Sequence, residues 1–392
     1  MLTQMNPFCF GKLLAAYYHC RNHKRNTANA GKFEIDFEAK LLQLEQELLE
    51  RNYSPGRSIC FVVTEPKTRE IFAADFGDRV IHHLLIGYLE PIWEPKFIFH
   101  SYACRKNKGA IKAITNLRKI IQKNHPASDY FLQIDIRSFF MSLNKKLLFN
   151  LIKKEVKNSE LLWLAEKIIF HNPTSDFLKK GQLKLFNLLP EGKSLFDVPD
   201  TRGLPIGNLT SQFFANVYLN ELDQFVKHKL KAQYYLRYVD DMLLLHKNPR
   251  QLEIWRDEID NFLRQKLKLE LHPEKTILKS VRRGINFVGY IVKPNYTLVR
   301  NRTVKKFKHK IWRFNQKILT DNPVQPIRLW TPELRQEFQQ MLAIVNSYYG
   351  IFKHADTYRL RKHLYEKHFN ILKLYLTPVN KNLDYFIWKE TS

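Results

Sequence analysis

Apolar residues recur at helical spacing in several parts of this chain, and each recurrence predicts a helix. Within residues 35–51 four leucines fall on one stripe, and the stretch ends before the turn-like segment Ser54–Gly56. Residues 79–90, which Pro91 is expected to end, and residues 110–123 show the same periodicity. Because the last of these stretches is rich in lysine and arginine, we expect a basic, helix-rich N-terminal region.

Two stretches in the middle of the chain have the composition of strands. Residues 130–136, YFLQIDI, alternate apolar and polar side chains, which predicts a strand. Residues 234–245, YYLRYVDDMLLL, are apolar on both sides of an aspartate pair, which predicts a β-hairpin. Between them, residues 209–230 place large apolar side chains on one helical stripe. Helices and strands in this order together predict an α+β fold.

Polar stretches that contain proline or glycine interrupt these patterns at Asn172–Thr201 and Asn322–Thr331, and both predict loops. The residues that follow Tyr290, on both sides of the second of these loops, are basic and helical in pattern. Five basic residues crowd into one or two turns of a predicted helix: Lys305, Lys306, Lys308, Lys310 and Arg313. That density suits binding along a nucleic-acid backbone, although charged helices often only face solvent.

Charge and aromatic content narrow the class of partner. Lysine and arginine number 64 against 38 aspartate and glutamate, so the formal net charge is +26. A polyanion is the expected partner of so basic a chain. Aromatic residues make up 13% of the chain and could stack on bases, which favours nucleic acid over a purely solvated basic surface around an aromatic core.

Cysteine usage and hydropathy indicate a cytoplasmic protein. The four cysteines include no CxxC pair and are too few to staple a chain of 392 residues. A zinc site at His19, Cys20 and His23 is disfavoured because a second ligand pair at finger-like spacing is missing from the sequence. No apolar run approaches the ~20 residues that span a bilayer, so neither secretion nor a membrane partner is expected.

Three aspartates form the strongest chemical signal in the chain. Asp240 and Asp241 lie at the tip of the predicted hairpin, and Asp135 ends the predicted strand, with the carbonyl of Ile136 beside it. Neighbouring carboxylates repel one another unless a cation lies between them, and Mg²⁺ prefers carboxylate oxygens together with substrate phosphates. Two ions ~3.5–4 Å apart stabilise phosphoryl transfer. An isolated aspartate pair would be ordinary turn chemistry.

Four motifs resemble those of reverse transcriptases, and they occur in that family's order. YVDD resembles the catalytic box, and LQIDIRSFF resembles the strand of the first aspartate. Residues 202–223, RGLPIGNLTSQFFANVYLNELD, resemble the motif beneath the incoming base pair, and residues 284–290, GINFVGY, resemble the strand that grips the primer end. Upstream, residues 66–85 and 100–113 are similar to the fingers of bacterial reverse transcriptases.

The resemblance implies a right-hand polymerase fold with an antiparallel palm sheet and a helical thumb. It implies an N-terminal helical region with fingers at 1–129, a palm at 130–290 that contains the 172–201 insertion, and a basic thumb at 291–392. It also implies two Mg²⁺ ions, with Mn²⁺ as an alternative, and four metal ligands: Asp135, Ile136, Asp240 and Asp241.

The remaining site residues follow from the same resemblance. Arg69 and Arg79 would meet the triphosphate or the template, although salt bridges could equally occupy them. Phe140 would pack on the sugar and exclude a 2′-hydroxyl unless it is an ordinary core residue, and Lys275 would be the acid for pyrophosphate departure unless it is a surface lysine. Further contacts to the substrate are expected from Ile206, Gly207 and Gln212, and further contacts to nucleic acid from Phe287, Gly289, Tyr290, Lys305, Lys306, Lys308 and Lys310.

The motif at 206–212 also suggests a subgroup. Retroviral and group II intron relatives usually carry Gln-Gly and end in Ser-Pro, whereas this chain has Ile206-Gly207 and ends in Ser211-Gln212. In that respect it looks like the enzymes of diversity-generating retroelements and related antiphage defence systems. The likeness implies an RNA-directed DNA polymerase that copies a small structured non-coding RNA into cDNA, using dNTPs and a DNA primer, with an accessory protein or homo-oligomer as further partners.

Two alternatives to reverse transcription remain open at this point. An RNA-templated RNA polymerase would share the aspartates but usually needs a smaller or polar residue where Phe140 stands. An RNA-binding scaffold with a decayed polymerase fold would have lost the aspartates, and all three are present.

Overall fold

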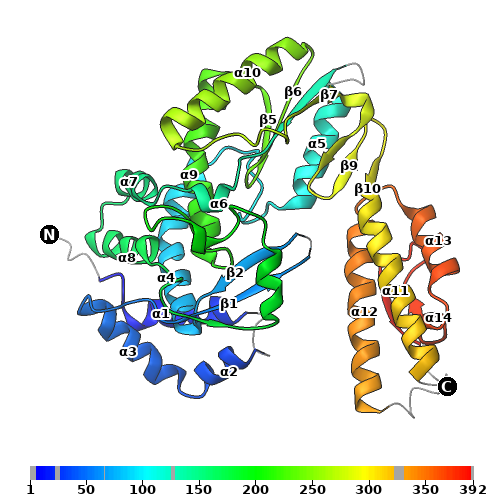
Figure 1. Ribbon diagram of the computed structural model, residues 1–392, viewed down its shortest axis with the longest axis horizontal. Helices are drawn as coiled ribbons and strands as arrows, with labels where there is room; N and C mark the ends of the chain where they lie inside the picture. The colour runs from blue at the N-terminus through cyan, green and yellow to red at the C-terminus, as the bar shows by residue number, and fades with distance from the viewer. Residues whose placement is uncertain (1–5, 23–26, 66, 125–128, 322–330, 390–392) are drawn as a thin grey trace. The chain divides into compact units, whose positions relative to one another are not determined.

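The fold is described from a computed structural model, which covers residues 6–22, 27–65, 67–124, 129–321 and 331–389 (Figure 1). The chain divides into two compact units. The first unit comprises residues 1–109, 132–244 and 250–277, and the second comprises residues 110–131, 245–249 and 278–392. The predicted boundaries of fingers, palm and thumb stay a prediction.

Helices dominate the first unit. They are α1 (Phe10–Arg21), α2 (Ala28–Glu34), α3 (Phe37–Leu49), α4 (Phe76–Trp93), α6 (Phe139–Ser142), α7 (Lys145–Glu155), α8 (Ser159–Phe170), α9 (Leu209–Gln224) and α10 (Pro249–Phe262). Helix α3 confirms the amphipathic helix expected in 35–51, with Leu41 and Leu48 fully buried. The expectation that Pro91 ends the next helix is wrong, because α4 continues through it to Trp93. Pro91 has no N–H to continue the helical hydrogen bonds, but only two residues of α4 follow it, so little of the helix depends on the missing bond.

A small sheet in the first unit has the strand order β2-β1-β4. Strand β1 (Ser58–Val63) pairs antiparallel with β2 (Arg69–Ala73) and parallel with β4 (Phe177–Lys179). The segment 172–201 was expected to be a loop, and the structure corrects this in part. Besides β4 it contains 3-10 turns at Leu183–Leu188 and Leu195–Asp197. A parallel strand needs a distant partner, so no local pattern could reveal β4.

The second sheet carries the aspartates and has the strand order β5-β6-β3-β7. Its strands are β3 (Tyr130–Ile134), β5 (Tyr234–Tyr238), β6 (Asp241–His246) and β7 (Ile277–Ser280). Strands β5 and β6 are joined by only two residues, a connection that requires an antiparallel pair. This confirms the predicted strand and the predicted hairpin. Because β6 lies beside β3, the hairpin tip is brought to the end of β3, where Asp135 follows.

The second unit contains α5 (Ala110–Asn124) and a basic helical region. Strands β8 (Ile285–Phe287), β9 (Tyr290–Val292) and β10 (Thr297–Val299) form an antiparallel sheet. Three helices follow, α11 (Asn301–Asp321), α12 (Pro332–Phe352) and α13 (Tyr358–His368), then the short α14 (Leu372–Tyr375). The strand pair β11 (Leu376–Pro378) and β12 (Phe386–Trp388) was not expected in a helical region. The loop expected at 322–331 lies outside the described residues up to Trp330.

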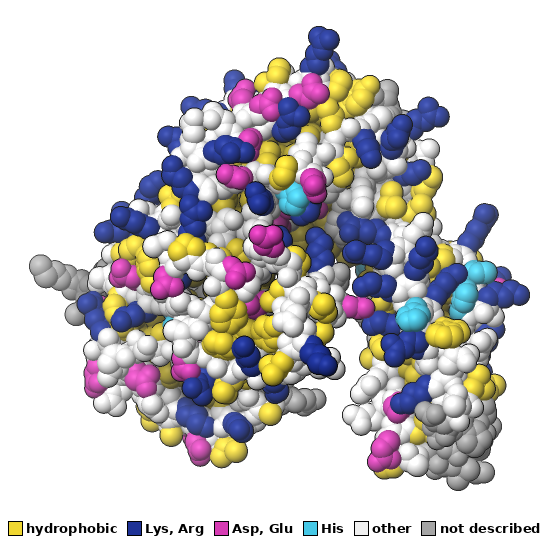
Figure 2. Space-filling model, viewed as in Figure 1, with side chains coloured by type: hydrophobic (Ala, Val, Ile, Leu, Met, Phe, Trp, Pro, Cys, Tyr) yellow, Lys and Arg dark blue, Asp and Glu magenta, His cyan; other side chains and the backbone are white. Residues whose placement is uncertain are grey.

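The surface agrees with the expectation of a basic chain. On the face seen in Figure 2, lysine and arginine side chains clearly outnumber acidic ones in both units. Across the described residues, no helix combines the length and the apolar character that crossing a bilayer would require.

A buried ion pair connects α9 to the hairpin. Arg237 of β5 and Asp223 of α9 are both fully buried, and the guanidinium donates to both carboxylate oxygens at 2.8 and 2.6 Å. The Tyr235 hydroxyl donates to the same carboxylate at 2.9 Å. Arg237 also donates to the carbonyl of Val239, in the hairpin turn, at 3.1 Å. The turn that carries the aspartate pair is therefore tied to the core through one arginine.

Replacing Arg237 by methionine should destabilise the protein strongly. We expect Arg237→Met to lower the free energy of unfolding by roughly 3–5 kcal/mol, because Asp223 would be left charged and buried. The double variant Arg237→Met/Asp223→Leu should regain much of this loss. Urea denaturation measures both, and Arg264→Met, which breaks an exposed pair with Asp260, is the matched control with little effect. Equal losses in Arg237→Met and Arg264→Met would contradict the role of the buried pair.

Candidate active site

The hairpin turn presents its aspartates from an unusual backbone conformation. Val239 has a φ of 56°, in the left-handed region that β-branched residues rarely adopt. Such a conformation persists only where the surroundings hold it, and such positions cluster at functional sites. The bond from Arg237 to the Val239 carbonyl is one such constraint. The turn thereby places Asp240 at the tip and Asp241 at the first position of β6.

The three predicted aspartates are brought together in the first unit. The carboxyl group of Asp240 lies within interaction distance of the carboxyl group of Asp135. Burial raises the pKa of Asp240 strongly, and the neighbouring carboxylates of Asp135 and Asp241 raise it further. Asp241 lies beside them and accepts a hydrogen bond from Gln133 of β3 at 2.9 Å. The negative charges of Asp135 and Asp241 thus disfavour the charged form of Asp240, and a cation bound among the three would relieve this repulsion.

A lysine already supplies positive charge to this cluster. The ammonium group of Lys275 forms an ion pair with the Asp135 carboxylate. Lys193, from the segment that precedes α9, interacts electrostatically with Asp135, Asp240 and Lys275. Burial lowers the pKa of Lys193, and the nearby Lys275 lowers it further. Sequence reasoning anticipated Lys275 but missed Lys193, which stands in no recognisable motif, and Gln133, which lies inside LQIDIRSFF but was not singled out there.

The donor set fits a divalent cation, with one rearrangement. Within the described ranges, no three His, Cys, Asp or Glu side chains are gathered as a ready-made metal cage. In this arrangement Lys275 engages Asp135 and Gln133 engages Asp241. Carboxylates that repel one another and attract lysine are nonetheless the oxygen ligands that Mg²⁺ prefers. If Lys275 leaves Asp135, both Asp135 and Asp240 can face a metal ion.

The backbone around Ile136 is consistent with its predicted use as a carbonyl ligand. Ile136 pairs with Leu271 in an isolated antiparallel bridge. The two hydrogen bonds of this bridge run from Arg137 N to Glu270 O at 2.9 Å and from His272 N to Asp135 O at 2.8 Å. Neither bond uses the Ile136 carbonyl, while the Ile136 side chain is buried. Its role as a metal ligand stays a prediction.

The loop before α9 is anchored to β2. The backbone N–H of Phe72 donates to the Ile206 carbonyl at 2.9 Å, and the N–H of Ala74 donates to the Asn208 side chain at 3.2 Å. Ile206 and Phe140 both pack, partly buried, against one apolar cluster, formed by Cys60, Phe72, Met141 and Leu195. Phe139 is buried whereas Phe140 is only half-buried. Phe140 therefore keeps an exposed part that a substrate could reach.

The other predicted substrate contacts occupy different surroundings. Arg79 donates from Nε to the Ala74 carbonyl at 2.8 Å and lines a cavity of about 420 Å³ together with Gly207. Arg69 is exposed at the start of β2, and Gln212 is exposed in the first turn of α9. The structure thus brings Arg79 and Gly207 together, and it does not place Arg69 or Gln212 in that cavity.

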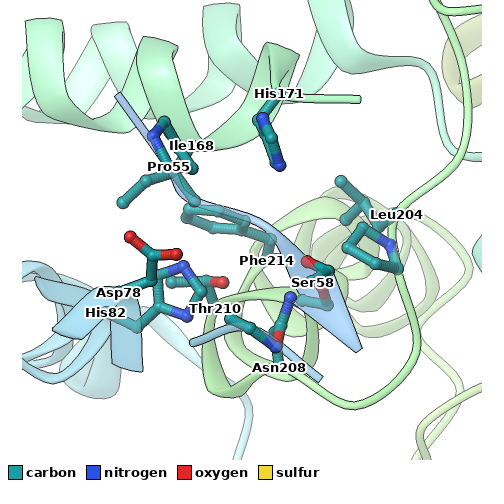
Figure 3. Close-up of a pocket in the computed structure, with 13 residues that line it drawn as sticks. Pro55, Ser58, Asp78, His82, Ile168, His171, Leu204, Asn208, Thr210 and Phe214 are labelled. Carbon is teal, nitrogen blue, oxygen red and sulfur yellow. The ribbon is translucent and has the colours of Figure 1, made fainter. Parts of the chain in front are cut away.

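A small polar cavity beneath the same loop is shown in Figure 3, where Asp78 and His82 of α4 and His171 lie around it. Burial raises the pKa of Asp78 to about 6 and lowers that of His82 to about 3. Asp78 accepts hydrogen bonds from Tyr53 and Gly56, while His82 Nδ1 and His171 Nε2 have no protein partner among the described residues. The cavity is thus bordered by one carboxyl group and two histidines, and burial shifts the pKa of all three groups against their charged forms.

The residues predicted to bind the primer belong to the second unit. Phe287 and Tyr290 are buried, and the Tyr290 hydroxyl donates to the Ile351 carbonyl at 2.9 Å. Their side chains are therefore core residues there, and the half-buried turn at Gly289 is the part left for nucleic acid. On α11, Lys305 is exposed, and three further lysines are half-buried: Lys306, Lys308 and Lys310. Nucleic-acid binding by any of these residues stays a prediction.

Of the residues considered for a zinc site, His23 lies outside the described residues and Cys20 is buried.

Gly207 should tolerate no side chain. It has a φ of 127°, and a Cβ there would lie 2.8 Å from Ile71 Cγ2 and 2.9 Å from the Phe72 carbonyl oxygen. We expect Gly207→Ala to lower the free energy of unfolding by roughly 1–3 kcal/mol through backbone strain and this clash. Gly87→Ala is the control, since a Cβ at Gly87 of α4 meets nothing within 4 Å. Thermal unfolding that is equally unchanged in both variants would show that the loop is not constrained there.

Known proteins resemble this chain over the region that holds the aspartates. Residues 64–292, more than half of the chain, match the family described as Reverse transcriptase (RNA-dependent DNA polymerase). Protein YkfC of Escherichia coli (strain K12) is 24% identical over 282 residues, which cover 63% of this chain and 69% of YkfC. The group II intron-encoded protein LtrA of Lactococcus lactis subsp. cremoris is 24% identical over 336 residues, which cover 69% of this chain and 52% of LtrA.

Two further proteins resemble the chain at lower sequence identity. A putative COX1/OXI3 intron 2 protein of Saccharomyces cerevisiae is 19% identical over 62% of this chain and 32% of its own length. The chain thus spans about two thirds of YkfC and about half or less of the other two. A solved structure of telomerase from Candida albicans, in complex with a fragment of telomeric RNA, covers 81% of this chain and 55% of that one. Its TM-score of 0.43 at 12% identity is too weak to bear on function. From the family match, the chain belongs to the reverse transcriptase family, which confirms the expected α+β right-hand polymerase fold and the expected enzyme class of RNA-directed DNA polymerase.

Proposed function

We propose that this chain extends a DNA strand on an RNA template by in-line attack of a 3′-hydroxyl on the α-phosphate of a dNTP. In this proposal Asp135, Asp240, Asp241 and the Ile136 carbonyl hold two Mg²⁺ ions, which Mn²⁺ could replace. The observation that carries it is the proximity of the three acids, since the carboxylates of Asp135 and Asp241 both raise the pKa of the buried Asp240. Acids held together against their mutual repulsion are stabilised by added positive charge, and divalent ions would supply more of it than Lys275 alone.

The family supports the general chemistry. Reverse transcriptases use divalent metal ions, and their substrates are nucleic acids. When bound, such ions stabilise the charge that develops on the attacking and leaving oxygens. The chain's own residues would mostly position the reactants, since phosphoryl transfer asks little covalent chemistry of a protein.

The other side chains would divide the positioning among them. Lys275 would move from Asp135 towards the departing pyrophosphate, where an ammonium group can donate a proton. Arg69 and Arg79 would hold phosphate oxygens, for which a planar guanidinium is suited. Ile206, Gly207 and Gln212 would border the incoming base pair. The primer and the product duplex would meet the turn at Gly289 and the lysines of α11.

The biological setting that we propose is narrower than the family. The motif IGNLTSQ at 206–212 supports a role in a diversity-generating retroelement or an antiphage defence system. The template would then be a small structured non-coding RNA, copied in the cytoplasm with an accessory protein or a second copy of the chain. The template would be identified by measuring cDNA synthesis on RNAs that are transcribed from the neighbouring genes.

Asp240→Ala should abolish synthesis and leave nucleic-acid binding in place. We expect primer extension with Mg²⁺ to fall by roughly three orders of magnitude or more, because charge stabilisation supplies most of the rate. Fluorescence anisotropy with a labelled primer–template should show nearly unchanged affinity. Asp257→Ala, at an exposed acid of α10, is the matched control and should extend primers normally. Retained extension in Asp240→Ala would refute the assignment, and a wild-type chain that binds RNA without any synthesis would favour the scaffold alternative.

Phe140→Ala should weaken the choice between dNTPs and NTPs. Because the half-buried ring would no longer fill the space of a 2′-hydroxyl, we expect the ratio of kcat/KM values for dNTP and NTP to fall by roughly 10- to 100-fold. Phe186→Ala controls for lost packing, since Phe186 contacts the same apolar cluster. A wild-type enzyme that prefers NTPs would instead support an RNA-templated RNA polymerase.

A further inference from the structure

Two lysines from separate parts of the chain, Lys275 and Lys193, interact with Asp135, and a third, Lys67, lies within electrostatic reach of Lys193. Lys275 follows the Ile136–Leu271 bridge, Lys67 belongs to the connection between β1 and β2, and Lys193 belongs to the segment before α9. The ammonium group of Lys193 interacts electrostatically with both aspartates and with both other lysines. It also affects His272, which in turn senses Asp135 and Lys275. These mutual interactions place Lys193 at the cluster, although it stands 58 residues after Asp135 in sequence.

The backbone around Lys193 is held on both sides. On the C-terminal side, the Ser194 hydroxyl and the Leu195 N–H donate to the buried carboxylate of Glu70 in β2, at 2.8 and 2.9 Å. Leu195 is itself buried in the apolar cluster with Phe72 and Met141. On the N-terminal side, Gly192 approaches Ser138, since a Cβ there would lie 3.8 Å from the Ser138 hydroxyl oxygen. Lys193 is therefore presented from a fixed segment rather than from a free loop.

Lys193 differs from Lys275 in one respect that points to a ligand. Lys275 has a carboxylate partner, whereas no hydrogen bond or ion pair in the described part of the chain engages the Lys193 ammonium group. Lys193 is half-buried, and two other lysines lie within electrostatic reach of it. A half-buried ammonium group among other cations is stabilised when a polyanion binds beside it.

We propose that Lys193 is a substrate-binding residue that holds the β- and γ-phosphates of the incoming nucleoside triphosphate and then the pyrophosphate product. The proposal rests on the proposed polymerase function. Phosphates are the fitting anions because Mg²⁺ on carboxylates is completed by substrate phosphates, which brings them within reach of groups that border Asp135 and Asp240. A triphosphate carries several negative charges, and three ammonium groups from three segments suit such a ligand better than a single backbone phosphate.

Kinetics of Lys193→Gln test the proposal. We expect the KM for dNTP to rise about tenfold or more, since a charge-assisted bond is lost, with inhibition by inorganic pyrophosphate weakened in parallel. Affinity for the primer–template, measured by anisotropy, should stay unchanged. Lys184→Gln removes an exposed lysine from the same segment and is the matched control. Lys193→Arg should keep KM within about threefold of the wild type, because arginine also binds phosphate.

Several results would overturn the assignment. An unchanged KM and unchanged pyrophosphate inhibition in Lys193→Gln would do so, and so would a loss of primer–template affinity alone, which would place Lys193 on the template backbone instead. Lys193→Met serves as a second charge-removing variant if Lys193→Gln unfolds at a lower temperature, since an apolar chain suits a half-buried position.

A binding measurement separates this proposal from the polymerase proposal. Titration calorimetry with inorganic pyrophosphate and Mg²⁺ needs no synthesis, and binding should weaken about tenfold or more in Lys193→Gln. If the wild-type chain makes no DNA but binds pyrophosphate through Lys193, the polymerase proposal fails and the phosphate site stands. If the wild-type chain makes DNA and Lys193→Gln binds pyrophosphate equally well, only the assignment of Lys193 fails.

Discussion

The geometry of the candidate active site depends on the buried ion pair between Arg237 and Asp223. A charged pair with no exposure is stable only when its hydrogen bonds are satisfied. Here Asp223 accepts from Arg237 and Tyr235, and Arg237 also donates to Asn216 and to the Val239 carbonyl. This single arginine thus connects α9, β5 and the hairpin turn. Because Val239 is held in a rarely adopted conformation, the direction of Asp240 follows from the ion pair.

Three aspartates of this basic chain gather at a site that lysines also border. The net charge of +26 would repel a metal ion from most of the surface, yet Asp135, Asp240 and Asp241 form a local exception. Lysines border that exception and, in Lys275, occupy part of it. Such an arrangement suits a reaction in which metal ions and a polyanionic substrate bind together. The metal ions would neutralise the aspartates, and the substrate would neutralise the lysines.

The segment 172–201 carries Lys193 and is bonded to the strand that anchors the loop of Ile206. Through Ser194 and Leu195 it is bonded to Glu70 of β2, and β2 is bonded to the loop of Ile206. The strand therefore positions both the loop expected to border the base pair and the lysine that we assign to the phosphates. A shift of β2 would move both together, and under the roles proposed for them this would couple recognition of the base to recognition of the triphosphate.

The sequence by itself determined what local patterns encode. Periodicity located α3, α5, α9 and the hairpin, and the motif order located Asp135, Asp240 and Asp241 and with them the family. It did not anticipate the continuation of α4 through Pro91, because helix ends respond to tertiary packing as well as to local propensity. Arg237 carried a signal that was available, since a charged residue inside an otherwise apolar strand needs a buried partner.

Only the tertiary structure decided which distant side chains meet. Glu70 and Ser194 are 124 residues apart in sequence, and Lys275 and Asp135 are 140 apart. The same holds for the burial of Phe287 and Tyr290, which a motif could name but whose surroundings it could not describe. The physical reason is that helix and strand patterns record contacts within a few residues, whereas an ion pair or a buried hydrogen bond depends on positions that the complete fold brings together.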